Sequence, residues 1–478
     1  MYKLKTNPWA HQWKALDYVM TRDEAAIFTD MGSGKTKIMI DLIVNRGFSL
    51  VLIIGTKKSC DVWEKEFEIH SDIPKNCVNN LSGMPTPSKV SIMKEKLSSG
   101  TNRGVPVVFI MNYEAVWRDP LKKYLYSLSY DCIILDESHR IKTPRSKVNI
   151  CVSTLGRRSR CKYILSGTPT PESPMDIYGQ YKFLKPEIFG SNFQKFREQY
   201  ENINAAETIR RGYIVLDEKE PYIHLDQLKK RMYKCAFYAQ SDVELPKVTH
   251  IYFDQHLSPE AQEVYIELNK EGVYEDESGI TETNNILAKY TRLQQLLSGW
   301  LFAENEDFTD QFLVEKDHTK AEALEYILEN IPKEEKVVVF AKYRKDFDNI
   351  QEVCRKLDRR YGEISGRSDD YKDWKKGRLD VVAVQYSSGA ESISLVEARY
   401  CIYYSHTFSY GQYQQSIKRT HRPGQTKPVT YYHIISKVKG KQTVDDKIKK
   451  ALSLKQSLSE YILTKELNKQ QFMQSGNV

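Results

Sequence analysis

The sequence has few cysteines, and they form no pattern that binds a metal or builds a disulfide framework. The eight cysteines include no CxxC pair and no Cys/His cluster. Zinc sites and disulfide-rich secreted domains depend on such spacings, so neither is expected here. Cys132 and Cys401 lie in apolar runs, which is typical of small buried residues. The sequence therefore predicts a chain without zinc in a reducing cytoplasm.

Long hydrophobic runs are also missing. The longest aliphatic runs, such as LVLII at 50–54, are far too short to cross a bilayer. The opening residues, MYKLKTNPWAHQWK, lack the apolar segment of a signal peptide. Because of these two observations we expect no membrane partner. The sequence also shows no fixed-period repeat and no low-complexity tail.

Charge of one sign is in modest excess only. The 71 basic and 63 acidic residues give a net charge of +8, which is compatible with a polyanionic partner without identifying one. Hydrophobic residues make up 40% of the chain, an ordinary composition for a folded protein. A length of 478 residues exceeds what one core supports, so two or three domains are expected.

Short apolar runs rich in β-formers alternate with helical patterns in two parts of the chain. They lie at 25–30, 50–56, 105–113, 131–137 and 162–168, and again at 336–342, 378–385, 399–405 and 428–435. Continuous apolar strands between helices indicate parallel sheets that are covered on both faces. We expect an α/β fold with two parallel-sheet lobes.

The region between these two sets breaks the alternation. Helical amphipathic stretches lie at 260–271 and 286–297, and a polar, acidic loop is expected at 272–285. We interpret the region as helical insertions and a lobe connection. The predicted domains are thus 1–185, 186–317 and 318–478.

The stretch FTDMGSGKTKIMIDLIV begins at a strand end and continues as an apolar helix. Gly32 and Gly34 allow backbone N–H groups to surround phosphate oxygens, while Lys35 reaches the β and γ phosphates and the Thr36 hydroxyl holds magnesium. Thr29 replaces the usual first glycine, but the strand before and the helix after favour the motif. We predict ATP and Mg²⁺ as ligands, with nucleotide contacts from Asp30, Met31, Gly32, Ser33, Gly34, Lys35 and Thr36.

The stretch YDCIILDESH places two carboxylates at the carboxyl end of a buried strand. Asp136 is suited to the magnesium shell, and Glu137 is suited to orient and deprotonate the attacking water. A strand that ends in acidic residues by chance is the alternative. Together with the glycine-rich loop, this motif indicates an NTPase that hydrolyses its nucleotide.

Gln12, Arg419 and Arg422 each have an ordinary and a functional interpretation. Gln12, in a helix expected to have Asn7 as its N-cap, is either a plain helix residue or a ligand for the N6 and N7 edge of adenine. Arg419 and Arg422, in KRTHRPGQ, are expected on one side of a helix. They are either solvated charges at the helix end or two fixed cations for a ligand.

The order of these motifs resembles the Swi/Snf-like branch of the superfamily-two DEAD/DEAH-box helicases, a group of DNA-dependent ATPases. The resemblance runs from NPWAHQ to about 443–455 and rests on DMGSGKTK, DESHRIKTPRSK, LSGTPTPESP, FLKPEIFG, VQYSSGAESISLVEA and QQSIKRTHRPGQ. It implies two RecA-like lobes with helical insertions and ATP in the cleft between them. The compact chain is similar to bacterial and phage-encoded members, so the cytoplasm of a bacterial or host cell is expected.

The resemblance also implies roles for individual residues. Arg419 and Arg422 are expected to act as arginine fingers on the phosphates. Gln12 is expected at the adenine, Glu391 at the ribose, and Ser166-Gly167-Thr168 as the link between ATP state and lobe movement. The DNA backbone contacts implied by the resemblance are Thr56, Lys57, Asn112, Lys342, Ser387 and Ser388. Residues of these types also commonly terminate strands, which is the ordinary explanation for them.

The expected function is a DNA-dependent ATPase that translocates along or remodels double-stranded DNA and its bound proteins. Binding of this kind is salt-dependent and largely insensitive to sequence. A strand-separating helicase acting on single-stranded DNA or RNA is one alternative, and a nucleotide-gated DNA-binding module with poor hydrolysis is another. The catalytic candidates are all present: Lys35, Asp136, Glu137, Arg419 and Arg422. Targeting is expected to come from a partner protein or from DNA structure.

Overall fold

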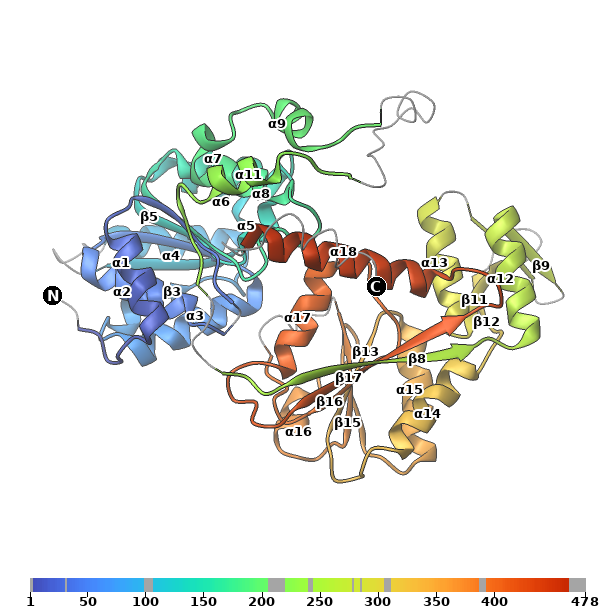
Figure 1. Ribbon diagram of the computed structural model, residues 1–478. Helices are drawn as coiled ribbons and strands as arrows, with labels where there is room; N and C mark the ends of the chain where they lie inside the picture. The colour runs from blue at the N-terminus through green and yellow to red at the C-terminus, as the bar shows by residue number, and fades with distance from the viewer. Residues whose placement is uncertain are drawn as a thin grey trace. The chain divides into compact units, whose positions relative to one another are not determined.

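The computed structural model describes residues 3–30, 32–98, 106–204, 220–239, 244–276, 279–283, 286–304, 311–386 and 393–463 (Figure 1). The chain forms two compact units. Unit 1 comprises Met1–Glu244 together with Lys455–Val478, and unit 2 comprises Leu245–Leu454. The division of the sequence at residues 185 and 317 stays a prediction.

Unit 1 is built on a seven-stranded sheet with the order β3-β4-β2-β5-β6-β1-β7. Neighbouring strands pair in parallel throughout its described residues. The strands are β1 (Glu24–Ile27), β2 (Leu50–Gly55), β3 (Val78–Asn80), β4 (Val107–Asn112), β5 (Tyr130–Leu135), β6 (Ser159–Leu165) and β7 (Ala236–Phe237). Alternate residues of one strand enter two different hydrophobic cores: Leu52 and Ile54 enter one, and Val51 and Ile53 enter the other. Burial on both faces explains the unbroken apolar runs.

Helices cover both faces of this sheet. The helices of unit 1 are α1 (Ala10–Met20), α2 (Lys35–Arg46), α3 (Lys57–His70), α4 (Thr86–Ser98), α5 (Tyr113–Val116), α6 (Leu121–Ser127), α7 (Lys147–Gly156), α8 (Asp176–Leu184), α9 (Phe193–Tyr200) and α11 (Leu225–Met232). Short 3-10 helices are η1 (Lys75–Cys77), η2 (Ser138–Ile141) and η3 (Pro186–Ile188).

The backbone of α8 packs directly on the end of η2. An ideal Cβ atom on Gly179 would lie 2.3 Å from the carbonyl oxygen of Ile141 and 2.4 Å from that of Lys142. Asn149 Nδ2 donates to the carbonyls of both Ile141 and Gly179, at 2.7 and 2.8 Å. The loop that follows the acidic pair is therefore held by backbone contacts that leave no room for a side chain.

Gly179→Ala is expected to lower the free energy of unfolding by roughly 1–3 kcal/mol, because the added methyl group overlaps backbone atoms that cannot rotate away. Urea denaturation measures this change. Gly83→Ala is the matched control, since a Cβ atom at Gly83 meets nothing within 4 Å. Equal stabilities for the two variants would contradict the close packing of α8.

Unit 2 is built on a six-stranded sheet with the order β14-β15-β13-β16-β17-β8, again parallel throughout its described residues. The strands are β8 (Val248–His256), β13 (Val337–Ala341), β14 (Tyr361–Ile364), β15 (Val381–Gln385), β16 (Tyr400–Tyr403) and β17 (Val429–Lys437). The helices are α14 (Thr319–Glu329), α15 (Arg344–Lys356), α16 (Tyr371–Lys375), α17 (Tyr410–Thr420) and α18 (Val444–Leu463). Residues of α18 from Lys455 onward belong to unit 1. The two RecA-like parallel-sheet units confirm the predicted α/β fold class.

The insertion contains more than the expected helices. The expected helices are present as α12 (Pro259–Glu271) and α13 (Ile286–Leu297), and a four-stranded antiparallel sheet lies beside them with the order β12-β11-β10-β9 (Figure 1). Its strands are β9 (Val273–Asp276), β10 (Gly279–Glu282), β11 (Trp300–Glu304) and β12 (Gln311–Glu315).

The expectation of a loop at 272–285 was wrong, because β9 and β10 pair there as a hairpin. The hairpin is joined to β11, and the Thr281 hydroxyl donates to the carbonyl of Phe302 at 2.9 Å. The acidic residues between short apolar stretches hid this strand signal in the sequence. β8 was also not predicted, since most of its residues are exposed at the edge of the sheet.

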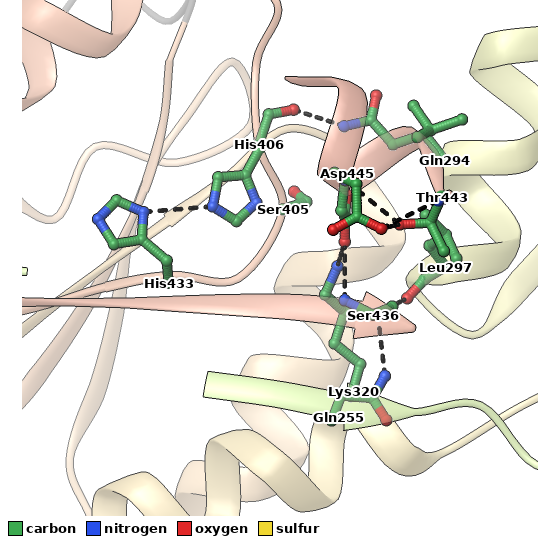
Figure 2. Close-up of polar contacts among 12 residues, drawn as sticks. Gln255, Gln294, Leu297, Lys320, Ser405, His406, His433, Ser436, Thr443 and Asp445 are labelled. Atoms are coloured by element: carbon green, nitrogen blue, oxygen red, sulfur yellow. Dashed lines mark hydrogen bonds and ion pairs between the residues drawn. The ribbon is translucent and has the colours of Figure 1, made fainter. Parts of the chain in front are cut away.

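A row of three histidines crosses the sheet of unit 2 from β8 to the end of β16. His250 Nδ1 lies 3.0 Å from His433 Nε2, and His433 Nδ1 lies 3.4 Å from His406 Nε2. Figure 2 shows His433 and His406, and it also shows that Gln294 Nε2 donates to the His406 carbonyl, at 2.6 Å. Burial lowers the pKa of His406 to about 4 and lowers the pKa of His433 well below its usual range. These rings are therefore neutral in the folded unit at pH 7.

A buried ion pair lies near this row. Lys320 Nζ and Asp445 Oδ2 are 3.2 Å apart, and their side chains are 1% and 0% exposed. The same carboxylate oxygen accepts from the Ser436 backbone N–H at 3.1 Å, as Figure 2 shows. These contacts fix the start of α18 on the sheet of unit 2.

The buried imidazole of His406 makes the stability of the protein sensitive to acid. The folded ring binds a proton only near pH 4, whereas the ordinary ring does so near 6.5, so the unfolded state holds more protons between these values. The free energy of unfolding should therefore fall as the pH is lowered. His406→Gln should remove about 2 kcal/mol of the loss between pH 7.5 and pH 5.

Urea denaturation at the two pH values measures this difference. His256→Gln is the control, because His256 is exposed on β8. An undiminished pH dependence in His406→Gln would show that the buried ring is not its source.

Candidate active site

The glycine-rich loop joins β1 to α2. Gly32 and Gly34 have φ angles of 80° and 79°, in the left-handed region that glycine adopts without strain. Gly34 is the N-cap of α2, and Thr36 lies half-buried in the first turn. Backbone N–H groups at this helix start are suited to a phosphate. Met31 lies outside the described residues.

The loop is held by polar contacts of its own residues. Lys35 is 9% exposed, and its Nζ donates to the carbonyls of Thr29 at 2.9 Å and Asp30 at 3.0 Å. The buried Thr29 hydroxyl lies 2.7 Å from the Ser33 hydroxyl. Thr29 therefore stabilises the loop at the position where a glycine is usual.

Gln12 contacts this loop from α1. Its Nε2 donates to the Ser33 carbonyl at 2.9 Å, and His11 Nε2 lies 2.8 Å from the same oxygen. Its Oε1 accepts from the Trp9 backbone N–H at 2.9 Å. Asn7 is not the N-cap, contrary to the sequence-based expectation, because the helix begins at Ala10 after Trp9 and the Gln12 side chain satisfies the free N–H group. The adenine contact of Gln12 stays a prediction.

The acidic pair lies at the carboxyl end of β5, beside β2. Asp136 is 8% exposed, and its Oδ2 accepts from Trp63 Nε1 at 3.0 Å. Its backbone carbonyl accepts from the Tyr113 hydroxyl at 2.7 Å. Glu137 follows with a φ angle of 49°, an uncommon conformation for a residue with a side chain. The backbone therefore turns sharply at the second of the two carboxylates.

The pKa values of the two carboxyl groups are shifted in opposite directions. Burial, followed by the negative charge of Glu137, raises the pKa of Asp136 to about 6. Burial acts against ionisation of Glu137 too, but contact with His139 and the charge of Lys35 lower its pKa below the usual value. Lys35 also favours the charged form of Asp136, so the glycine-rich loop and the acidic pair belong to one electrostatic site.

A chain of side chains connects Glu137 to the end of β6. His139 Nδ1 lies 3.3 Å from Glu137 Oε2 and 3.4 Å from Ser166 Oγ. Ser166 is fully buried, and its Oγ accepts from the backbone N–H of Thr168 across Gly167 at 3.1 Å. The predicted coupling segment thus contacts the acidic motif within unit 1.

The donor set fits magnesium bound together with a nucleotide. Mg²⁺ is usually held by one or two carboxylates, phosphates and water rather than by a complete protein cage. The described part of the chain contains no group of three or more His, Cys, Asp or Glu side chains that could hold a metal alone. Asp136 has a buried carboxylate on which the charge of Lys35, at the start of α2, acts. It is therefore suited to hold magnesium together with phosphates and water.

Three of the predicted DNA contacts, Thr56, Asn112 and Lys342, have hydrogen-bond partners within the protein. Thr56 is the N-cap of α3 and accepts from the Ser59 backbone N–H at 3.2 Å, and Lys57 is the exposed first residue of that helix. Asn112, at the end of β4, donates to Glu114 at 2.8 Å. In unit 2, Lys342 Nζ donates to Gln294 Oε1 at 2.7 Å, and burial lowers its pKa. The other two predicted DNA contacts, Ser387 and Ser388, and the predicted ribose contact, Glu391, lie outside the described residues.

The two arginines do not share one helix, contrary to the sequence-based expectation. α17 ends at Thr420, and Arg422 lies in the following turn, whose Gln425 N–H donates to the Arg422 carbonyl at 3.0 Å. Pro423 disfavours helical backbone at the residue before it, which explains the early end. Arg419 is 2% exposed, and burial lowers the pKa of Arg422. Both guanidinium groups are thus largely withdrawn from water.

Sequence reasoning missed the partners of the acidic pair. Trp63 and Tyr113 contact Asp136 because β2, which precedes the helix of Trp63, lies next to β5, and β4, which precedes the helix of Tyr113, lies on the other side of β2. His139 was visible in the sequence as the last letter of DESH, but its contact with Ser166 depends on the pairing of β5 with β6.

A model of the SNF2-related domain matches residues 11–300, and a model of the helicase conserved C-terminal domain matches residues 319–424. Among the described residues no helix has the length and apolar character needed to span a bilayer.

Several proteins are similar to this chain. They include an uncharacterized ATP-dependent helicase, MG018, of Mycoplasma genitalium, which is 24% identical over 372 residues, or 76% of this chain and 33% of that protein. Putative protein p41 of Acyrthosiphon pisum secondary endosymbiont phage 1 is 21% identical, with 95% of this chain and 98% of that protein covered. The chain spans only 33% and 40% of the length of the two mycoplasma helicases that it matches.

Among solved structures, the Sulfolobus solfataricus SWI2/SNF2 ATPase core in complex with dsDNA is 18% identical, with 97% of this chain and 94% of that chain covered and a TM-score of 0.41. The SNF2-related domain model alone covers more than half of the chain, and the helicase C-terminal model follows it. The chain therefore belongs to the family of proteins with an SNF2-related domain, here followed by a helicase conserved C-terminal domain.

Proposed function

We propose that this protein is a DNA-dependent ATPase that couples ATP hydrolysis to movement along double-stranded DNA or to remodelling of DNA and its bound proteins. The observation that carries the proposal is the arrangement in unit 1. There the charge of Lys35 acts on both Asp136 and Glu137, and His139 links Glu137 to Ser166. Such an arrangement serves phosphoryl transfer to water.

Unit 1 would bind the nucleotide through the loop between β1 and α2. The backbone N–H groups around Gly32 and Gly34 would contact the phosphates, and Lys35 would exchange its two carbonyl partners for phosphate oxygens. Magnesium would be held by Thr36 and Asp136 with the phosphates, and it would neutralise the charge that develops there. Gln12 already contacts the Ser33 carbonyl and is proposed to contact adenine.

Glu137 is proposed to accept the proton of the attacking water. Its lowered pKa keeps it ionised at neutral pH, which a general base requires. His139 Nδ1 lies 3.3 Å from one carboxylate oxygen and 3.4 Å from the Ser166 hydroxyl, so it is placed to transmit a change at either residue to the other. We propose that Ser166, Gly167 and Thr168 transmit nucleotide state in this way.

Arg419 and Arg422 are proposed to stabilise the transferring phosphoryl group. Burial has removed much of their water, which makes a polyanionic partner favourable.

The proposal for DNA rests on the family and on its relatives. These include an ATP-dependent DNA helicase, DDM1, of Arabidopsis thaliana and the chromatin-remodeling complex ATPase ISW2 of Saccharomyces cerevisiae. The net charge of +8 is compatible with the same partner.

The test is the steady-state ATPase rate with no nucleic acid, single-stranded DNA, blunt duplex DNA or RNA, each at low and moderate salt. Strong stimulation by the duplex that declines as salt rises supports the proposal, because phosphate contacts release counterions. Stimulation by single strands alone would favour a strand-separating helicase, which the helicase names of several relatives also support. A strand-displacement assay then decides between them. No hydrolysis under any condition would leave a nucleotide-gated binding module.

A further inference from the structure

A cavity of about 650 Å³ lies on unit 1, and none of its lining residues belongs to the candidate active site. Its size falls within the range of small-molecule sites. The cavity is lined by Trp117, Arg118, Asp119, Lys122, Tyr126, Lys147, Ile150 and Cys151. They come from the end of α5, from α6 and from the first turns of α7.

Two cations face the ring of Trp117. Lys147 Nζ lies 5.1 Å from the ring centroid, and Arg118 Cζ lies 5.4 Å from it. Within the described residues neither cation is in an ion pair. Lys122 does have one, with Asp119 at 3.4 Å. The cavity thus combines an aromatic surface with one carboxylate, Asp119, which is paired with Lys122, and with two positive charges that lie outside the ion pairs of the described residues.

The walls also include apolar surface. Ile150, on α7, is 51% exposed and adds an aliphatic side chain to the lining. Tyr126, on α6, is half-buried, and burial raises the pKa of its hydroxyl to about 12. The ring of a ligand would therefore meet aromatic and aliphatic atoms, and its charged groups would meet cations.

The cavity residues come soon after the strand ends at which the nucleic-acid path is predicted. Only the four residues of α5 separate Trp117 from Asn112, a rise of roughly 8 Å along a helix. On the other side, the run RIKTPRSK leads from the acidic motif to Lys147 and contains three more basic residues. Arg140 is paired with Glu114 at 3.2 Å and Lys142 with Asp176 at 3.8 Å, and Arg145 lies between them and Lys147 in the sequence. Basic residues thus lie along the segment that joins the acidic motif to the cavity.

We propose that this cavity binds an unpaired nucleotide of a nucleic-acid strand. The base would contact Trp117, and the phosphates on its two sides would contact Arg118 and Lys147. Every base has a face that stacks on an aromatic ring, and a nucleotide inside a strand carries a phosphate on each side. The two cations at one ring therefore suit a nucleotide with its two phosphates better than an acidic peptide residue, which brings a single carboxylate.

This inference deepens the proposed function, because it assumes that the protein binds nucleic acid and adds a class of substrate. A duplex that carries a single-stranded extension would supply both the backbone for unit 1 and the unpaired nucleotide for the cavity. The site would then direct the ATPase to such DNA without a partner protein.

The experiment measures binding of a fluorescently labelled oligothymidylate to the full chain by anisotropy, without nucleotide and over a range of salt. Trp117→Ala should weaken binding roughly tenfold, in line with the loss of one stacked base. Lys147→Glu should also weaken it and should reduce the slope of log affinity against log salt by about 0.7 or more. A glutamate in the first turn of α7 favours the helix dipole, so this variant is expected to fold.

Lys94→Glu is the matched control, since Lys94 Nζ also lies over an aromatic ring, that of Tyr124 at 5.7 Å, but does not line the cavity. Weaker binding in the two cavity variants and unchanged binding in the control supports the proposal, as does the same pattern with an RNA strand. Unchanged affinity in Lys147→Glu, or equal losses in Lys94→Glu, would overturn it. Stimulation of the wild-type ATPase by blunt duplex tests the proposed function separately.

Discussion

Arg422→Ala is expected to lower the DNA-stimulated rate of ATP turnover by roughly 10³- to 10⁵-fold, the range that arginine fingers contribute in phosphoryl transfer. Nucleotide affinity should change little, because the charge that this arginine stabilises develops only in the transition state. Turnover is measured at saturating ATP and duplex DNA, and affinity is measured by binding of a fluorescent ATP analogue.

The surroundings of Arg422 make this a specific expectation. The residue lies in a turn closed by the Gln425 N–H, and the Gln425 side chain donates to the carbonyls of Val396, Ala398 and Thr420 at 3.1, 2.9 and 3.2 Å. The turn is therefore held independently of the arginine side chain. Alanine should remove the guanidinium group without moving the backbone.

Lys418→Ala is the matched control, because Lys418 is a half-buried cation near the end of the same helix. Arg422→Lys separates charge from shape, since an ammonium group cannot make paired contacts with two phosphate oxygens. A rate for Arg422→Ala within a few-fold of wild type would remove the finger assignment. A comparable loss in Lys418→Ala would assign the effect to general charge instead.

The central strands of both units could be predicted from sequence because they are buried on both faces. Val51 to Ile54 of β2 and Val337 to Ala341 of β13 are each fully buried, so they form unbroken runs of apolar residues. β8 lacks this signal because most of its residues are exposed at a sheet edge. The small antiparallel sheet was missed since its strands are short and interrupted by acidic residues.

The candidate site could be predicted only where its chemistry is contiguous in sequence. Gly32, Gly34 and Lys35 lie within four positions. The two glycines are needed because the turn there requires positive φ angles. The contacts of Asp136 with Trp63 and Tyr113 join segments that are far apart, and only the strand order brings them together. The position of Arg422 beyond its helix depended on one proline, whose effect competed with an otherwise helical spacing.

Glu137→Gln is expected to reduce ATP turnover by roughly 10²- to 10⁴-fold, the usual contribution of a general base. Glutamine has nearly the same shape but cannot accept the proton of the attacking water. ATP should still bind, because Lys35 and the glycine-rich loop are unchanged. Single-turnover hydrolysis and nucleotide binding, measured side by side, separate these two effects.

The matched control for this change is Glu66→Gln. Glu66 also contacts a histidine, His70 at 2.9 Å, but it lies on the outer part of α3. If Glu137→Gln hydrolyses ATP at the wild-type rate, then Glu137 is not the base, and the contact with His139 has another purpose. If both variants lose activity equally, the loss reflects Glu–His contacts in general. A large loss in Glu137→Gln alone would assign the proton transfer to the carboxylate that His139 and Lys35 keep ionised.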